Sequence, residues 1–226
     1  MLKSKRRNIL TPQSEHARLS GMIAFHWGNH NFDKPELDFN AFITAVTFHD
    51  RGYEAFDCSA IPESDEKTWL AHQKRGMERN WGNPIVDLLV KFHIRRLVAA
   101  RKTAERDVLV ERWDRVIEEE LAQNGFDREL FLWADHITQL CDNIAFDFCF
   151  EEPCARSVGV CAKRGEMGTV DVGYEIVGDG GILLRPWPLQ VDEVRSFVVS
   201  YHEEAYPEVK SPVLLPFYVG RAKVLS

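Results

Sequence analysis

The sequence predicts a mainly α fold that carries a small C-terminal antiparallel β appendage. Apolar residues recur at three- and four-residue spacing as far as about residue 150, and after Pro153 the pattern changes to alternation. At 226 residues the chain has the length of one compact domain with or without a small extension. We therefore expect a helical domain over residues 1–153 and a β-rich extension over residues 154–226, packed on the helices.

The first two predicted helices place three polar residues on inward-facing stripes. Thr11 followed by Pro12 suits a helix start, with the threonine as N-cap and the proline in the first helical position. Helical spacing from there places His16 on the buried side of the first helix. The apolar stripe of the second helix leads directly into His49 and Asp50, which continue it.

Four further helices are predicted, beginning near Ser64 and Pro84 and then spanning Arg106–Gln123 and Arg128–Phe150. The first of these carries His72 and the second carries His93. The last is strongly apolar, yet Asp135 and Asp142 belong to a narrow polar strip along it. Buried charge without a partner is very costly, so this strip needs partners, and a metal ion would supply one.

Short alternating segments predict the strands of the β extension. They are Val158–Val160, Val170–Ile176, Ile182–Leu184, Arg195–Tyr201 and Val213–Val219. The glycine-rich segment at residues 178–181 predicts a hairpin turn between the second and third of them.

The net charge of −7 argues against sequence-independent nucleic-acid binding, which requires a basic surface. No apolar segment has the length of a membrane span, and the basic N-terminus lacks the apolar core of a secretory signal. Five cysteines without a CxxC pair indicate neither a disulfide framework nor a zinc ribbon. We expect a cytoplasmic protein without nucleic-acid or membrane partners; the oligomeric state stays open, and a dimer is one option.

One local cluster is basic: Arg95, Arg96, Arg101, Lys102 and Arg106. A solvated helix face explains it most simply. The alternative is that Arg95 or Arg96, close to His93, contacts a small anionic substrate.

The adjacent His49 and Asp50 offer an imidazole nitrogen and a carboxylate to a single cation. His16 upstream and Asp142 downstream would complete a mixed nitrogen and oxygen set, which suits Mn²⁺, Fe²⁺, Zn²⁺, Ni²⁺ or Mg²⁺. Each histidine also has a structural explanation: His16 could be a core histidine bonded to a backbone carbonyl, and His72 could simply be packed beside Trp69.

The order of His16, His49-Asp50 and Asp142, each on a predicted helix, resembles the HD superfamily of metal-dependent phosphohydrolases. The strings EHARLSGMIAFHWGN, FHDRGY, LVKFHIRRL, LCDNIAFDFC and PWP together resemble one uncharacterised family of HD-like domains. The resemblance implies an HD-like helical fold with those four residues as metal ligands. It also places His72 and His93 where some HD proteins hold a second metal ion.

Three functions follow as expectations. The first is hydrolysis of a small phosphate ester or anhydride by a metal-activated water, with Asp50, His93 and Arg96 as catalytic residues. The second is a di-iron oxygenase, which requires both His72 and His93 as ligands. The third is a non-catalytic binding or sensing module that uses the metal for stability. Asp135 is expected either to orient a ligand imidazole or to face solvent.

Overall fold

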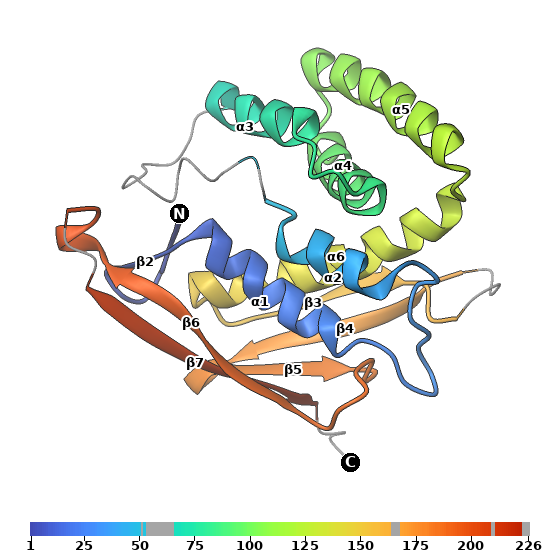
Figure 1. The fold of residues 1–226 in the computed structure, drawn as a ribbon. Helices are drawn as coiled ribbons and strands as arrows, with labels where there is room; N and C mark the ends of the chain where they lie inside the picture. The colour runs from blue at the N-terminus through green and yellow to red at the C-terminus, as the bar shows by residue number, and fades with distance from the viewer. Residues whose placement is uncertain (51, 53–65, 164–167, 209–210, 223–226) are drawn as a thin grey trace.

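The computed structural model describes residues 1–50, 52, 66–163, 168–208 and 211–222. Within these ranges the chain is an α/β protein with six helices and one mixed sheet of seven strands (Figure 1). The prediction of a mainly α, HD-like helical fold with a small β appendage is therefore wrong. The sheet is a full layer of the molecule, and both ends of the chain contribute to it.

The N-terminal residues supply two strands that the sequence did not predict, β1 (Leu2–Lys3) and β2 (Ile9–Thr11). The remaining strands are β3 (Cys154–Val160), β4 (Val170–Val177), β5 (Gly181–Arg185), β6 (Val194–His202) and β7 (Pro212–Arg221). Their order in the sheet is β1-β2-β6-β7-β5-β4-β3. All neighbours pair antiparallel except β5 and β7, which pair parallel.

The pairing of β2 with β6 explains why the residues before the first helix are extended. Ile9 pairs with His202, and the buried side chains of Thr11 and Ser200 are joined by a 2.7 Å hydrogen bond between their hydroxyls. Thr11 is thus a strand residue rather than the expected N-cap. Helix α1 (Gln13–Phe25) begins after Pro12 without a side-chain cap.

The other helices are α2 (Phe39–Thr47), α3 (Glu66–Glu78), α4 (Pro84–Ala99), α5 (Ala104–Asn124) and α6 (Arg128–Phe150). Four of them have N-cap side chains that accept hydrogen bonds from first-turn amides, namely those of Asp38, Asn83, Thr103 and Asp127. The predicted helices from Pro84 onward are confirmed, because caps and apolar spacing are local signals.

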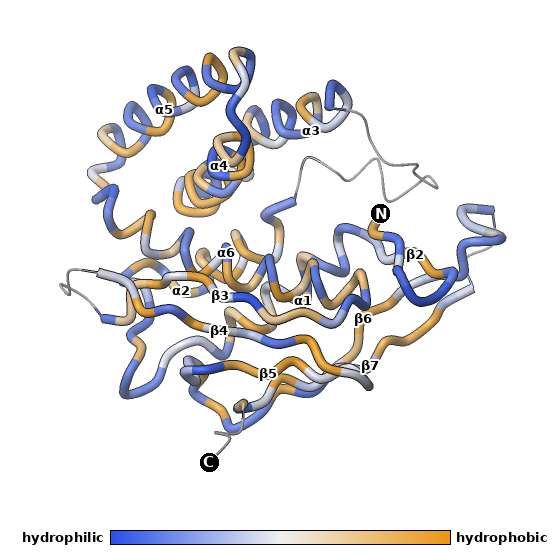
Figure 2. Tube along the Cα trace, turned by 180° about the vertical axis from the view of Figure 1, so that it is seen from behind, coloured by the Kyte–Doolittle hydropathy of each residue, from blue (hydrophilic) through white to orange (hydrophobic). Residues whose placement is uncertain are grey.

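The helices form two layers over one face of the curled sheet. Helix α1 packs against β6, and α6 packs against β3, β4 and β1. Helix α4 packs in turn on α2 and α6, and carries α3 and α5 farther from the sheet (Figure 1). The hydropathy of the helices agrees with this layered packing. Helices α4 and α6 are apolar over most of their length, whereas hydrophobic and hydrophilic residues alternate along α5 (Figure 2).

Gly21 lets α1 approach α2 closely. A Cβ atom at this position would lie 2.0 Å from Oγ1 of Thr47 in α2. Since His49 follows α2 by two residues and His16 lies in α1, this close approach brings the two histidines together.

No helix among the described residues has the length and apolar character needed to cross a bilayer. The division of the chain at residue 153 stays a prediction.

Candidate metal centre

Four elements bring five predicted site residues together at the junction of the two helical layers. His16 comes from α1, His49 and Asp50 from the turn after α2, His93 from α4, and Asp142 from α6. The three histidine side chains are almost fully buried, and the two aspartate side chains are 11% and 10% exposed. Such a set of polar groups is stable in a protein interior only if its members satisfy one another or share a ligand.

The separations between these side chains suit ligands of a single ion. Oδ1 of Asp142 lies 2.8 Å from Nε2 of His16 and 3.2 Å from Nε2 of His49. Oδ2 of Asp50 lies 3.3 Å from Nδ1 of His16 and 3.9 Å from Nε2 of His49. Metal–ligand bonds of ~2.1 Å at right angles place neighbouring ligand atoms about 3 Å apart.

Two groups of residues could therefore hold a metal ion: His16, His49 and Asp142 form one, and His49, Asp50 and His93 form the other. The expectation of a metal cofactor agrees with the structure to this extent.

His49 has the orientation of a metal ligand. Its Nδ1 lies 2.7 Å from the carbonyl oxygen of Val46. A carbonyl only accepts, so Nδ1 carries a proton and Nε2 offers its lone pair. This Nε2 is buried without a hydrogen-bond partner among the described residues, and it faces the carboxylates of Asp142 and Asp50. A lone pair directed at two carboxylates requires a cation between them, either a proton or a metal ion.

The pKa shifts of the site residues also indicate ionised carboxylates that attract a cation. Burial lowers the pKa of His16, but hydrogen bonds to Asp142 and Asp50 outweigh burial and raise it to about 10. Burial raises the pKa of Asp142, but the neighbouring His49 and His16 hold it well below its usual range. The two carboxylates are thus ionised and attract positive charge, for which protons and metal ions compete.

His93 is held differently from His49. Nη2 of Arg96 donates to Nδ1 of His93 at 2.9 Å, and Nε of the same guanidinium donates to Oδ2 of Asp135 at 2.9 Å. Burial, together with the nearby His49 and Arg96, holds the pKa of His93 well below its usual value. The expected orienting role of Asp135 is consistent with this arrangement, although Asp135 acts on the imidazole through Arg96.

His72 is not brought into either group. It lies in α3, and its Nδ1 is 3.1 Å from the carbonyl oxygen of Gly52. The ring is buried, and it also contacts Arg75. The role of His72 as a metal ligand stays a prediction that the described geometry does not support.

The basic cluster is neutralised by acids. Arg95 makes two 2.8 Å hydrogen bonds to Asp114 of α5, and Arg106 pairs with Glu66. Nη1 of Arg101 lies 3.9 Å from Oε2 of Glu66, and Nζ of Lys102 lies 3.8 Å from Oδ1 of Asp107. Arg96 is the one cation of this cluster that reaches the candidate metal centre.

Sequence reasoning missed Phe146. Its ring is 42% exposed and makes an edge contact with the buried ring of His16, at 6.1 Å between centroids. It lies four residues after Asp142, one helical turn further along the polar strip. That spacing was the available signal, and it places a partly exposed apolar ring beside His16.

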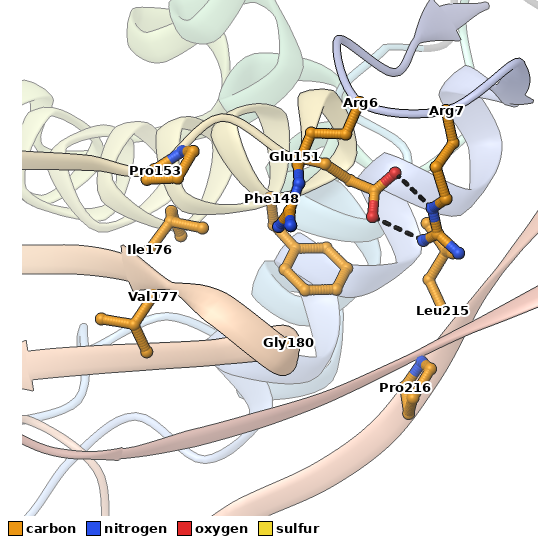
Figure 3. A pocket seen from close by; sticks show the side chains of 10 residues that line it. All are labelled: Arg6, Arg7, Phe148, Glu151, Pro153, Ile176, Val177, Gly180, Leu215 and Pro216. Atoms are coloured by element: carbon orange, nitrogen blue, oxygen red, sulfur yellow. Dashed lines mark hydrogen bonds and ion pairs between the residues drawn. The ribbon is translucent and has the colours of Figure 1, made fainter.

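A hollow of about 530 Å³ lies apart from the candidate metal centre, between the N-terminal loop, the end of α6 and the sheet (Figure 3). Across it, Nε of Arg7 donates to Oε2 of Glu151 at 2.9 Å, and Arg6 lies beside this pair. Since Ser4 also donates to Glu151, the contacts fix the N-terminal loop to α6. Among the described residues, the lining contains no histidine, aspartate or cysteine.

The model of a family described as a protein of unknown function, DUF3891, matches residues 1–202. The chain therefore belongs to this family. No curated protein and no solved structure matches it. The identification with the HD superfamily is wrong, because the match is to DUF3891 and the helices cover a large curled seven-stranded sheet, unlike the helical HD fold.

Proposed function

We propose that the chain is a metal-dependent hydrolase that acts on a small phosphate ester or anhydride. His16, His49, Asp50 and Asp142 would hold one divalent ion. Two ionised carboxylates and two neutral imidazoles carry a charge of −2, which a divalent cation neutralises. Nitrogen and oxygen ligands together suit Mn²⁺, Fe²⁺, Zn²⁺ or Ni²⁺, and Mg²⁺ less well.

The observation that carries the proposal is the orientation of His49. Its proton is held by a backbone carbonyl, and its free nitrogen is directed at two carboxylates in a buried position. Histidines that bind metals typically donate their second N–H to a carbonyl or carboxylate in this way.

Hydrolysis fits the remaining groups. A divalent ion with open positions lowers the pKa of bound water and offsets charge on phosphoryl oxygens. Arg96, whose side chain is 21% exposed and is paired with Asp135, would present a guanidinium at the edge of the site that can donate to an anionic substrate. Phe146 would contact the uncharged part of that substrate. A di-iron oxygenase requires His72 as a ligand, and His72 lies in neither group, so we do not propose that function.

The test uses the full chain, stripped with a chelator and reloaded separately with each of the five metals. Ion content per chain is measured by mass spectrometry, and hydrolysis is measured on aryl phosphates, nucleotides and pyrophosphate. We expect one ion per chain and metal-dependent phosphate release. His49→Gln should abolish both, and the control His30→Gln, an exposed histidine outside the site, should abolish neither.

Each outcome bears on a different part of the proposal. Failure to bind any of the five metals would overturn the metal centre. Stable metal binding without hydrolysis of any phosphate would overturn the hydrolase and leave a binding or sensing module.

A further inference from the structure

His49 and His93 lie side by side, with ring centroids 4.6 Å apart, but their second nitrogens meet opposite kinds of partner. Nδ1 of His49 meets a carbonyl oxygen, which only accepts. Nδ1 of His93 meets Nη2 of Arg96 at 2.9 Å. A guanidinium only donates and keeps its protons throughout the range of pH in which proteins fold.

The contact with Arg96 fixes where the proton of His93 resides. Nδ1 must accept from Arg96, so a neutral His93 carries its proton on Nε2. A proton on Nδ1 would place N–H against N–H at hydrogen-bond distance. Arg96 cannot easily turn away, because Asp135, only 4% exposed, holds its Nε at 2.9 Å.

The Nε2–H of His93 is directed into the site without an acceptor. The side chain is fully buried, and Nε2 has no hydrogen-bond partner among the described residues; its nearest carboxylate oxygen, Oδ1 of Asp50, is 3.9 Å away. A nitrogen that carries a proton has no lone pair in the ring plane for a cation. His93 is therefore a poor metal ligand, although it is close enough to the other groups to be one.

We propose that His93 is a hydrogen-bond donor to the substrate and not a metal ligand, so that the site holds one metal ion. Its Nε2–H would donate to an oxygen of a phosphate ester or anhydride bound beside the ion, and Asp135 and Arg96 are positioning residues that hold the proton on Nε2. This inference rests on the proposed metal centre.

Protonation of ring nitrogens can be read directly by NMR. The full chain is labelled with ¹⁵N-histidine, and long-range ¹H–¹⁵N spectra are recorded without metal and with Zn²⁺. His49→Gln and His93→Gln assign the two rings. We expect the Nε2–H form for His93 in both states, and a Zn²⁺-dependent shift of Nε2 of His49 that His93 does not show.

Metal affinity gives a second readout that does not depend on activity. His93→Gln keeps an amide donor in place of Nε2–H, so it should retain one ion per chain with an unchanged Kd. Loss of a true ligand in His49→Gln should weaken binding by more than about 100-fold. Arg96→Met should leave the ion in place and shift His93 toward the other protonated form.

The failure of this inference differs from the failure of the proposed function. A Zn²⁺-shifted Nε2 of His93, two ions per chain, or loss of the ion in His93→Gln would overturn the donor role and leave the metal centre intact. Absence of any Zn²⁺-dependent shift would overturn both.

Discussion

Substitution of Gly21 by alanine tests whether the close approach of α1 and α2 forms the metal centre. The added Cβ would lie 2.0 Å from Oγ1 of Thr47, and 3.0 Å and 3.2 Å from its Cβ and Cα. Oγ1 of Thr47 donates to the carbonyl oxygen of Ile43 at 2.8 Å, so it cannot rotate away without losing that bond. The helices must separate or the threonine must give up its hydrogen bond.

The expected magnitude combines three effects. Alanine in place of glycine within a helix stabilises by up to about 1 kcal/mol. Overpacking costs about 1–3 kcal/mol, and loss of the threonine hydrogen bond costs about 1 kcal/mol. The net result should be a loss of about 1–3 kcal/mol in the free energy of unfolding, measured by urea titration of the metal-free protein.

The same substitution should weaken metal binding, because α1 carries His16 and α2 leads to His49. A companion variant, Gly21→Ala with Thr47→Ala, removes the closest clashing atom and should recover most of both losses. If Gly21→Ala alone were neutral or stabilising, or if stability fell while metal affinity stayed constant, the link between helix packing and the site would be refuted.

Three further predictions follow from the described contacts. In the metal-free protein, the raised pKa of His16 contributes stability that is complete below pH 6.5 and is lost as the pH rises toward about 10. The urea concentration at the midpoint of unfolding should therefore fall as the pH rises across this window. His16→Asn should show no such fall, and its absence in the unchanged protein would contradict this prediction. Tyr174→Phe removes a buried 2.6 Å hydrogen bond to Asp147 and should cost about 1.5–3 kcal/mol in unfolding free energy without changing metal affinity; a metal-binding defect would show that this contact acts on the site. Arg95→Ala breaks a partly exposed ion pair with Asp114 and should lower the free energy of unfolding by less than about 1 kcal/mol. Phosphate release should be unchanged, because Arg95 faces α5. A large rise in KM would instead show that Arg95 contacts the substrate.

Helix α6 shows what the sequence could predict about the fold. Its cap at Asp127 and its apolar stripe are local, and the predicted range Arg128–Phe150 matches the structure. The strands after Pro153 were also visible as alternation, but their assembly was not. Ile9 pairs with His202 at the other end of the chain, and β1 and β2 are too short to show a period, so the sheet was taken for an appendage.

The proximity of five polar residues was easier to predict from the sequence than the fold around them. His16, His49, Asp50, His93 and Asp142 do gather, because a polar residue on an apolar helix face needs a partner in any fold that buries that face. The distinction between His49 and His93 depends on which group meets Nδ1. The sequence spacing indicated the contact between His93 and Arg96, because residues three apart on one helix are neighbours.

The parallel pairing of β5 with β7 has a consequence for how the protein forms. Strand β7 lies between β5 and β6, so a strand that is made after both of them joins the two halves of the sheet. Until residues 212–221 are in place, β5 and β6 each expose an unpaired edge, which can recruit another chain. Truncation before Pro212 should therefore yield aggregates rather than a smaller folded protein, and a ribosome-bound chain would rely on chaperones until residues 212–221 have emerged.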